Sequence, residues 1–429
     1  MTPGSISAGD TAWVLVSSAL VLLMVPALAL FYAGLVRQRG ALNTVMMSVV
    51  ALAVVSVQWI LVGYSLAFGA GSVIGGAGWF GLSGVGAAPG PYGATIPHLA
   101  FAVFQAMFAG ITVALISGAV VERMKFSMFV VFALAWTTYV YDPLAHWVWA
   151  NDGWLHKLGA LDFAGGTVVH ISAGTAAVVV AAFVGPRSEA DRSHGRPHNV
   201  VFTMIGAALL WVGWFGFNAG SALAADGVAA NAFVTTHGAA AAAMVVWLIL
   251  EFKTAGKASA VGAATGAVVG LVAVTPAAGY VTPVAALVIG GAAAIASHTA
   301  LRFRNRFRVD DALDVFACHG VAGVVGAMLT GVFATTVVNA GGGNGLLAGN
   351  PRLLWVQALA VGVTIAFTAP MTALVMVCVR TLGSLRVPQS AALDGVDVAE
   401  HGELAYSDDF VPVSGMVLTS SSPAQADAA

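Results

Sequence analysis

Charged residues are what this sequence has least of. Only 8% of its 429 residues are charged, whereas 59% are hydrophobic and the mean hydropathy is +0.90. A soluble domain carries about a quarter charged residues, so the composition excludes an ordinary soluble protein and indicates a polytopic membrane protein. The basic residues form no block large enough to bind nucleic acid, and the net charge of −2 gives no reason to expect such a partner.

Cysteine is nearly absent as well. The two cysteines, Cys318 and Cys378, fall in apolar segments, so the sequence predicts neither a disulfide framework nor a metal site. Nothing in it predicts a cofactor. The first ten residues lack Lys and Arg, and the apolar run after them is longer than the core of a signal peptide. We therefore expect a retained first helix.

Long apolar runs make up most of the chain. A helix needs about 20 apolar residues to cross a bilayer, and we find eleven such segments. They lie at about 11–36, 43–69, 98–121, 126–145, 163–184, 200–222, 232–252, 258–276, 279–301, 312–337 and 353–380. A Gly-rich segment, 70–97, follows the second segment, and a polar loop, 142–162, follows the fourth. The pattern predicts an all-α membrane protein with eleven transmembrane helices.

The basic residues predict how the chain is oriented. With the N-terminus outside, all but two of the 17 Lys and Arg residues fall on the inner side, the exceptions being Lys157 and Arg352. This asymmetry is typical of cytoplasmic loops. We expect a transmembrane domain at 1–380 and a polar, acidic cytoplasmic tail at 381–429, of which the last twenty or so residues are disordered.

One motif, Asp-x7-His-x2-Ala-Gly, occurs twice. Its copies are Asp162/His170/Ala173/Gly174 and Asp311/His319/Ala322/Gly323. A histidine inside an apolar segment is costly to bury, so each is a functional candidate. The two lie in the fifth and tenth segments, and five is odd, so helices 1–5 and 6–10 have opposite topology. Such an inverted repeat brings the histidines together and leaves the eleventh helix outside. Two unrelated buried histidines remain the alternative.

Two facing imidazoles can hydrogen-bond to a small polar solute or relay a proton. Haem ligation is a weaker alternative, because a four-helix haem site usually supplies two histidines per helix. Asp162 stands at the start of its helix, where a carboxylate caps free N–H groups. That role is compatible with one at a substrate site.

Several aromatic residues stand where they can do more than pack. Trp149 precedes the fifth segment in the expected outer loop, Phe217 and Ser221 end the sixth segment, and Phe108 lies within the third. An aromatic face and a hydroxyl at the mouth of a pore suit a small cation, through cation–π attraction and one hydrogen bond. Deeper rings would exclude water.

Five stretches resemble the ammonium transporter family (Amt/MEP/Rh). They are DFAGGTVVH at 162–170, GWFGFNAGS at 213–221, FQAMFAGITVALISGAVVERMKF at 104–126, DDALDVFACHGVAGVVG at 310–326 and LRVPQSAALDGVDVAEHGELAY at 385–406. The resemblance extends from about residue 11 to 406. The tail motif makes it similar to the bacterial-type Amt branch more than to the Rh branch.

The resemblance implies roles for matched positions. These are substrate recruitment at Trp149, Ser221, Phe108 and Asp162, a gate at Phe108 and Phe217, and a pore twin-histidine pair at His170 and His319. It also implies a homotrimer in the cytoplasmic (inner or plasma) membrane and a tail, 385–406, that docks a PII-family signalling protein. The loop between Trp149 and Asp162 is about one residue longer than the common pattern.

The resulting hypothesis is an ammonium transporter that takes up NH4+, deprotonates it and conducts NH3, with separate or coupled proton transfer. Methylammonium would serve as an analogue. The main alternative is an ammonium sensor that signals through its tail. A water channel is disfavoured because paired Asn-Pro-Ala half-helices are missing from the sequence. An enzyme is disfavoured because no nucleophile–base pair stands out.

Overall fold

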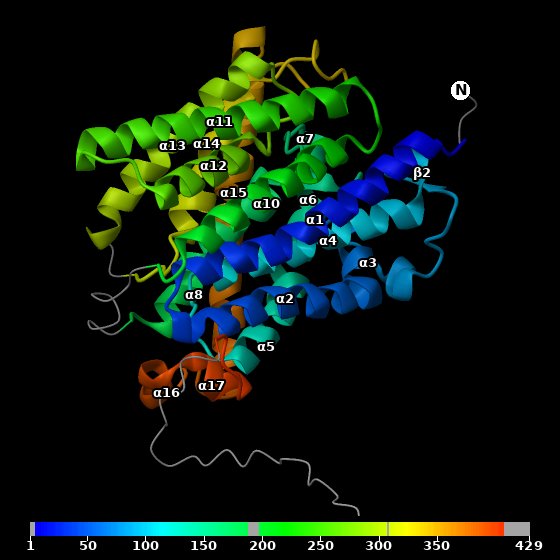
Figure 1. The fold of residues 1–429 in the computed structure, drawn as a ribbon. Helices are drawn as coiled ribbons and strands as arrows, with labels where there is room; N and C mark the ends of the chain where they lie inside the picture. Colours follow the sequence, from blue (N-terminus) through cyan, green and yellow to red (C-terminus); the bar gives the residue numbers. More distant parts are fainter. Residues whose placement is uncertain (1–4, 188–196, 307–308, 407–429) are drawn as a thin grey trace, which may run out of the picture.

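The computed structural model describes residues 5–187, 197–306 and 309–406, which are almost entirely helical (Figure 1). Within them, ten helices are long and apolar enough to cross a membrane. An eleventh apolar helix, α12, has only 15 residues. Each of the eleven segments predicted from hydropathy falls on one of these helices. The structure therefore confirms a helical membrane protein, with the eighth segment shorter than expected.

The described residues form long helices, several short helices and one small β-hairpin. The longer helices are α1 (Ala8–Leu35), α2 (Ala41–Gln58), α4 (His98–Ser117), α5 (Phe126–Trp136), α8 (Ser172–Val184), α10 (Val200–Ala219), α11 (Gly227–Ala255), α12 (Ala260–Val274), α13 (Pro283–Phe303), α14 (Ala322–Phe333) and α15 (Pro351–Thr381). The shorter ones are α3 (Tyr64–Phe68), α6 (Asp142–Trp149), α7 (Trp154–Leu158), α16 (Gln389–Asp394) and α17 (Val396–His401). A small hairpin, β1 (Pro89–Gly90) and β2 (Gly93–Pro97), lies in the Gly-rich segment.

In the part of the chain that the structure describes, four π-helical segments extend or interrupt these helices. They are η2 (Trp59–Gly63), η4 (Thr137–Tyr141), η5 (Gly166–Ile171) and η8 (Phe316–Val321). Short 3-10 turns complete the set at η1 (Gln38–Gly40), η3 (Ala77–Leu82), η6 (Gly220–Ala222), η7 (Arg304–Arg306) and η9 (Leu346–Ala348). Single π turns inside α-helices occur frequently at functional sites. Two of the four contain the histidines of the repeated motif.

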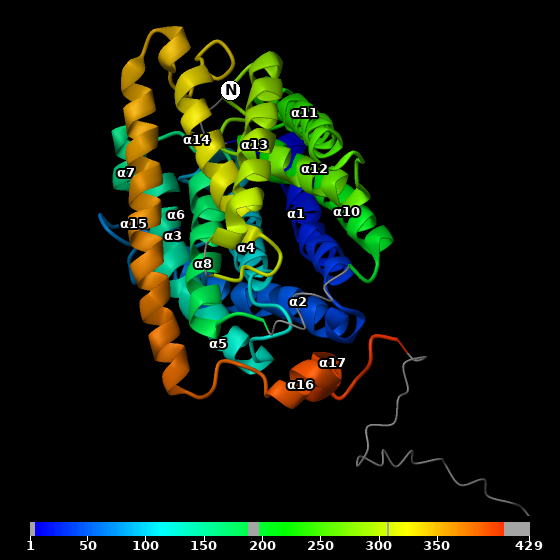
Figure 2. The same cartoon turned by 90° about the vertical axis from the view of Figure 1, so that its left-hand side faces the viewer.

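Glycines bring the two halves of the chain into close contact. On α10, a Cβ at Gly206 would lie 2.4 Å from the Phe31 backbone nitrogen of α1. At the fifth and tenth segments, a Cβ at Gly174 would lie 2.3 Å from the Gly320 nitrogen. Small residues allow such close helix packing in a membrane. The first span thus packs on the sixth and the fifth on the tenth, as the inverted repeat requires. Figure 2 shows α15 along one edge of the bundle.

The predicted polar loop 142–162 is wrong in its first half. Residues Asp142–Trp149 form helix α6, which continues from η4 without a break. Asp142 and Pro143 follow the π turn η4 directly, within this continuous helix. Trp149 is therefore the last residue of a helix and not a loop residue. A helix end holds its side chain more firmly than a loop would.

The tail packs beneath the bundle, as Figures 1 and 2 show for α16 and α17. The Asp397 carboxylate accepts hydrogen bonds from the backbone N–H groups of Leu42 and Asn43, at 3.0 and 2.8 Å, in the first turn of α2. Glu400 accepts one from the N–H of Phe126, the first residue of α5, at 2.9 Å. Both carboxylates thus cap helix N-termini. The disorder predicted for the last residues concerns positions 407–429, outside the described residues.

Candidate functional site

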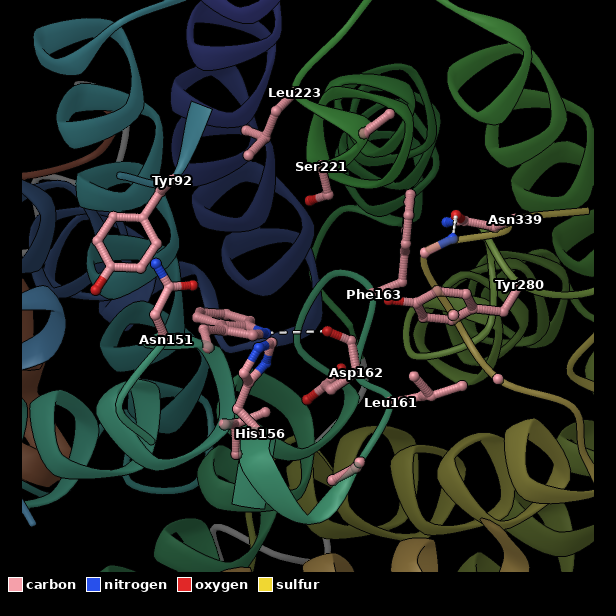
Figure 3. Close-up of a pocket in the computed structure, with 18 of the residues that line it drawn as sticks. Tyr92, Asn151, His156, Leu161, Asp162, Phe163, Ser221, Leu223, Tyr280 and Asn339 are labelled. Carbon is pink, nitrogen blue, oxygen red and sulfur yellow. Dashed lines mark hydrogen bonds between the residues drawn. The ribbon is translucent and has the colours of Figure 1, made fainter. Parts of the chain in front are cut away.

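A cavity of about 720 Å³, which we call the outer cavity, is bordered by α6 and α7. Figure 2 shows these two helices well away from the tail helices α16 and α17. Trp149, Phe108, Ser221 and Asp162, the four predicted recruitment residues, all line it. They come from the end of α6, the turn η6 that follows α10, the middle of α4 and the segment before η5. Figure 3 shows Ser221 and Asp162 facing the cavity, between Tyr92 on one side and Tyr280 on the other.

A hydrogen bond from the indole N–H group holds the Trp149 side chain in place. Its indole Nε1–H donates to the backbone carbonyl oxygen of Asp162 at 3.0 Å, the bond drawn in Figure 3. The Phe108 ring stands perpendicular to the indole, with 5.9 Å between centroids. Ser221 Oγ donates to the Phe217 carbonyl oxygen at 2.8 Å. Because its hydrogen is used in that bond, the hydroxyl can only accept from a solute in the cavity.

The Asp162 carboxylate is occupied with local hydrogen bonds. The backbone N–H groups of Gly165, Gly166 and Thr167 donate to it at 2.8, 2.6 and 2.8 Å, and the Thr167 hydroxyl donates as well. Gly165 has a φ of +111°, which a residue with a side chain rarely adopts. These bonds are the capping that the sequence predicted. The backbone carbonyl of the same residue accepts the hydrogen bond that holds Trp149.

Two phenylalanine rings close the floor of the outer cavity. Phe108 and Phe217 stack with centroids 4.2 Å apart and an interplanar angle of 25°, and both are about 1% exposed. Phe108 lines the outer cavity, whereas Phe217 lines a second, smaller cavity beneath it. The structure brings together the two residues predicted to form a gate. The ring pair separates the two cavities.

The second cavity, which we call the inner cavity, is lined by both histidines. Its volume of about 20 Å³ is enough for about one water-sized molecule. The Nδ1 atoms of His170 and His319 lie 3.3 Å apart, and the rings are nearly parallel at 23°. One Nδ1 must carry the proton that it donates to the other, so the neutral pair presents one Nε2 acceptor and one Nε2–H donor. The Nε2 of His170 has no partner among the described residues.

Comparison with known proteins shows which family has this sequence. The model of the Ammonium Transporter Family matches residues 12–406. The ammonium transporter of Bacillus subtilis is 47% identical over 402 residues, which cover 93% of this chain and 99% of that protein. Ammonium transporter Amt1 of Archaeoglobus fulgidus is 44% identical, with coverages of 94% and 100%. The chain belongs to the ammonium transporter family. Its relatives are transporters, so the prediction that it is not an enzyme is confirmed.

Solved structures of family members have the same fold. The crystal structure of Mep2 from Candida albicans matches with a TM-score of 0.85 at 34% identity, covering 96% of this chain and 94% of that one. A structure described as a sensor Amt protein matches with a TM-score of 0.83 at 29% identity, covering 92% and 98%. The likeness to both extends over nearly the whole transporter.

The sequence analysis did not identify Trp214, which lines the inner cavity. The Trp214 ring stacks on His170, with centroids 5.5 Å apart at 21°. Its Nε1–H donates to the Thr275 hydroxyl at 2.9 Å, which fixes the ring. Trp214 precedes Phe217 by three residues, so the helical period puts both on one face of α10. That spacing within GWFGFNAGS was the available signal.

Proposed function

We propose that this transporter takes NH4+ from the outer cavity and passes it through the inner cavity as NH3. The observation that carries the proposal is a path in two stages. A roomy polar cavity is followed, behind a stacked ring pair, by a space for one small molecule bordered by two imidazoles. The two cavities together form the path that we call the pore.

Recruitment of the cation rests on three groups of the outer cavity. The Trp149 ring offers its face to a cation, and the Ser221 hydroxyl accepts a hydrogen bond from it. The Asp162 charge lies within the same cavity wall. Cation–π attraction is worth about 0.5–2 kcal/mol, which suits a solute that must leave again. Phe108 contributes the ring edge beside Trp149.

Selectivity against K+ follows from the cost of burying charge. An unpaired ion in an apolar space costs far more than a few weak contacts return. K+ bears that cost in full, whereas NH4+ can leave a proton behind and cross as NH3. Ammonia needs only hydrogen-bond partners, and His170 and His319 offer one acceptor and one donor. The same imidazoles can carry the proton separately.

An electrical measurement tests the proposal and separates its two forms. Purified protein is reconstituted into vesicles and exposed to an ammonium gradient, with a K+ gradient of equal size as the control. Coupled transfer of NH3 and H+ predicts a current with ammonium and none with K+. Uptake of ammonium without any current would reject coupling, and equal currents for both ions would reject the proposal itself.

The proposed function also implies a membrane location, an assembly and a cytoplasmic partner for this protein. We place the protein in the cytoplasmic membrane as a homotrimer, with the outer cavity and N-terminus outside and the tail in the cytoplasm. The basic-residue asymmetry supports this orientation. The tail then offers α16 and α17 to a PII-family protein on the cytoplasmic side.

A sensor role is the second candidate. Two observations favour considering it: the likeness to a structure described as a sensor Amt protein, and tail carboxylates that contact the first turns of α2 and α5. A tail so connected can transmit a change in the bundle. Removing residues 381–429 separates the roles, because a transporter keeps its uptake whereas a sensor loses its output.

A further inference from the structure

The second copy of the repeated motif places a carboxyl group at the tail-side end of the pore, where the function described so far gives it no role. Asp162 and Asp311 each precede a histidine by eight residues, and each lies four or five residues before the π-helical segment that contains that histidine. Asp162 accepts from the N–H of Thr167, five residues on, and Asp311 accepts from the N–H of Phe316, also five residues on, at 2.7 Å. The two carboxyls are thus structural counterparts.

The counterparts differ in how their oxygens are used. Both oxygens of Asp162 accept hydrogen bonds from donors in the following turn. In Asp311, Oδ2 accepts from Phe316, while Oδ1 is buried and has no partner among the described residues. A buried carboxyl oxygen without a donor is costly as an anion. A proton on Asp311 removes that cost, and the O–H can then be donated to a solute.

Asp311 does not line the inner cavity itself but lies close to residues that do. It is close enough to Tyr32 and Cys318, which both line that cavity, to interact with them electrostatically. The turn that holds it also packs there: Leu313 lines the cavity, and its N–H donates to the Gly118 carbonyl at 3.1 Å. The Asp311 residue as a whole is partly exposed, so water at the tail side can supply it with protons.

We propose that Asp311 is the proton donor that converts NH3 to NH4+ as it leaves the inner cavity. The Asp311 O–H bond breaks as a fourth N–H bond forms, which leaves a carboxylate and ammonium. The carboxylate then takes a new proton from water on the tail side. Because the charged product cannot re-enter an apolar space cheaply, this step keeps ammonia from returning. The inference rests on the proposed conduction of NH3.

The charges around Asp311 are compatible with donation near neutral pH. Burial raises the pKa of Asp311 to about 7, opposed by the Phe316 N–H and aided by the Asp314 charge. The acid is therefore protonated below pH 7 and loses its proton as the pH rises through 7. The titratable and charged groups that face it are Tyr32 on α1, Arg123 after α4, Cys318 on η8, and Asp314 in its own turn.

The test is methylammonium uptake into vesicles whose internal pH is set between 6 and 8 at constant external pH. Vesicle orientation is scored by protease access to the tail. We expect the wild-type rate to fall about tenfold across this range, as the protonated fraction of a group titrating near pH 7 does. In Asp311→Asn the side chain still accepts from Phe316, and we expect a low rate that does not change with internal pH. A wild-type pH profile in this variant would overturn the proposal.

Asp314→Asn is the matched control and also covers the case in which Asp311→Asn does not fold. Asp314 pairs with Arg304 and raises the pKa of Asp311. Removing its charge should keep the pH dependence and move its midpoint to lower internal pH. An unmoved midpoint would also count against the proposal. If wild-type protein took up no methylammonium at all, the proposed function would fail instead.

Discussion

At the scale of single residues, the outer cavity depends most on Trp149. In the proposed recruitment step the ring provides the cation-binding face, and its Nε1–H fixes it to the Asp162 carbonyl. We expect Trp149→Ala to raise the apparent KM for ammonium about two- to thirty-fold, the equivalent of a lost cation–π contact, with a smaller change in maximal rate. Trp149→Phe keeps a ring and loses the hydrogen bond, so its KM should lie between. An unchanged KM in the alanine variant would show that Trp149 does not contribute to ammonium recruitment.

Residue-scale prediction succeeded where a side chain's neighbours follow from symmetry. The repeat of Asp162 and His170 in Asp311 and His319 was enough to expect that the two imidazoles meet, and their Nδ1 atoms are 3.3 Å apart. The position of Asp162 at the start of its helix also predicted that its carboxylate caps backbone N–H groups, but not that both of its oxygens are occupied in this way. Such local hydrogen bonds depend on the turn at Gly165, which residue types alone do not specify.

At the scale of elements, hydropathy predicted the helices and missed their interruptions. Apolar length locates a span because a membrane requires about 20 apolar residues, and all eleven segments fall on helix. The same criterion ended the fourth span too early, because polar residues in α6 resemble a loop although the helix continues to Trp149. The π turns η5 and η8 were also invisible, since one extra residue per turn leaves the hydrophobic pattern almost unchanged.

The contact between the two histidine helices gives the element-scale prediction. A Cβ at Gly174 would lie 2.3 Å from the backbone nitrogen of Gly320, where nothing can move aside cheaply. Gly174→Ala should therefore push η8 away, cost about 1–3 kcal/mol as overpacking does, and reduce transport. Gly362→Ala is the control, because its Cβ meets nothing within 4 Å. Equal thermal stability and transport in the two variants would contradict the close contact.

At the scale of the whole molecule, the described part of the tail, up to residue 406, is joined to the bundle. Asp397 and Glu400 cap α2 and α5, so a protein that binds α16 and α17 can act on both helices. We expect a PII protein to be retained by the full chain and lost when residues 381–429 are removed, with uptake preserved. A pull-down that gives no complex under any nucleotide condition would contradict the predicted partner.

The histidine pair provides the most direct test of the whole account. His170→Ala and His319→Ala are each reconstituted beside the wild type, after size exclusion confirms folding, and transport of ammonium and K+ is measured under equal gradients. We predict that each variant transports ammonium more slowly or with less discrimination against K+, because the NH3 path loses one of its two hydrogen-bonding groups. Unchanged rate and unchanged selectivity in both variants would contradict conduction between the two imidazoles.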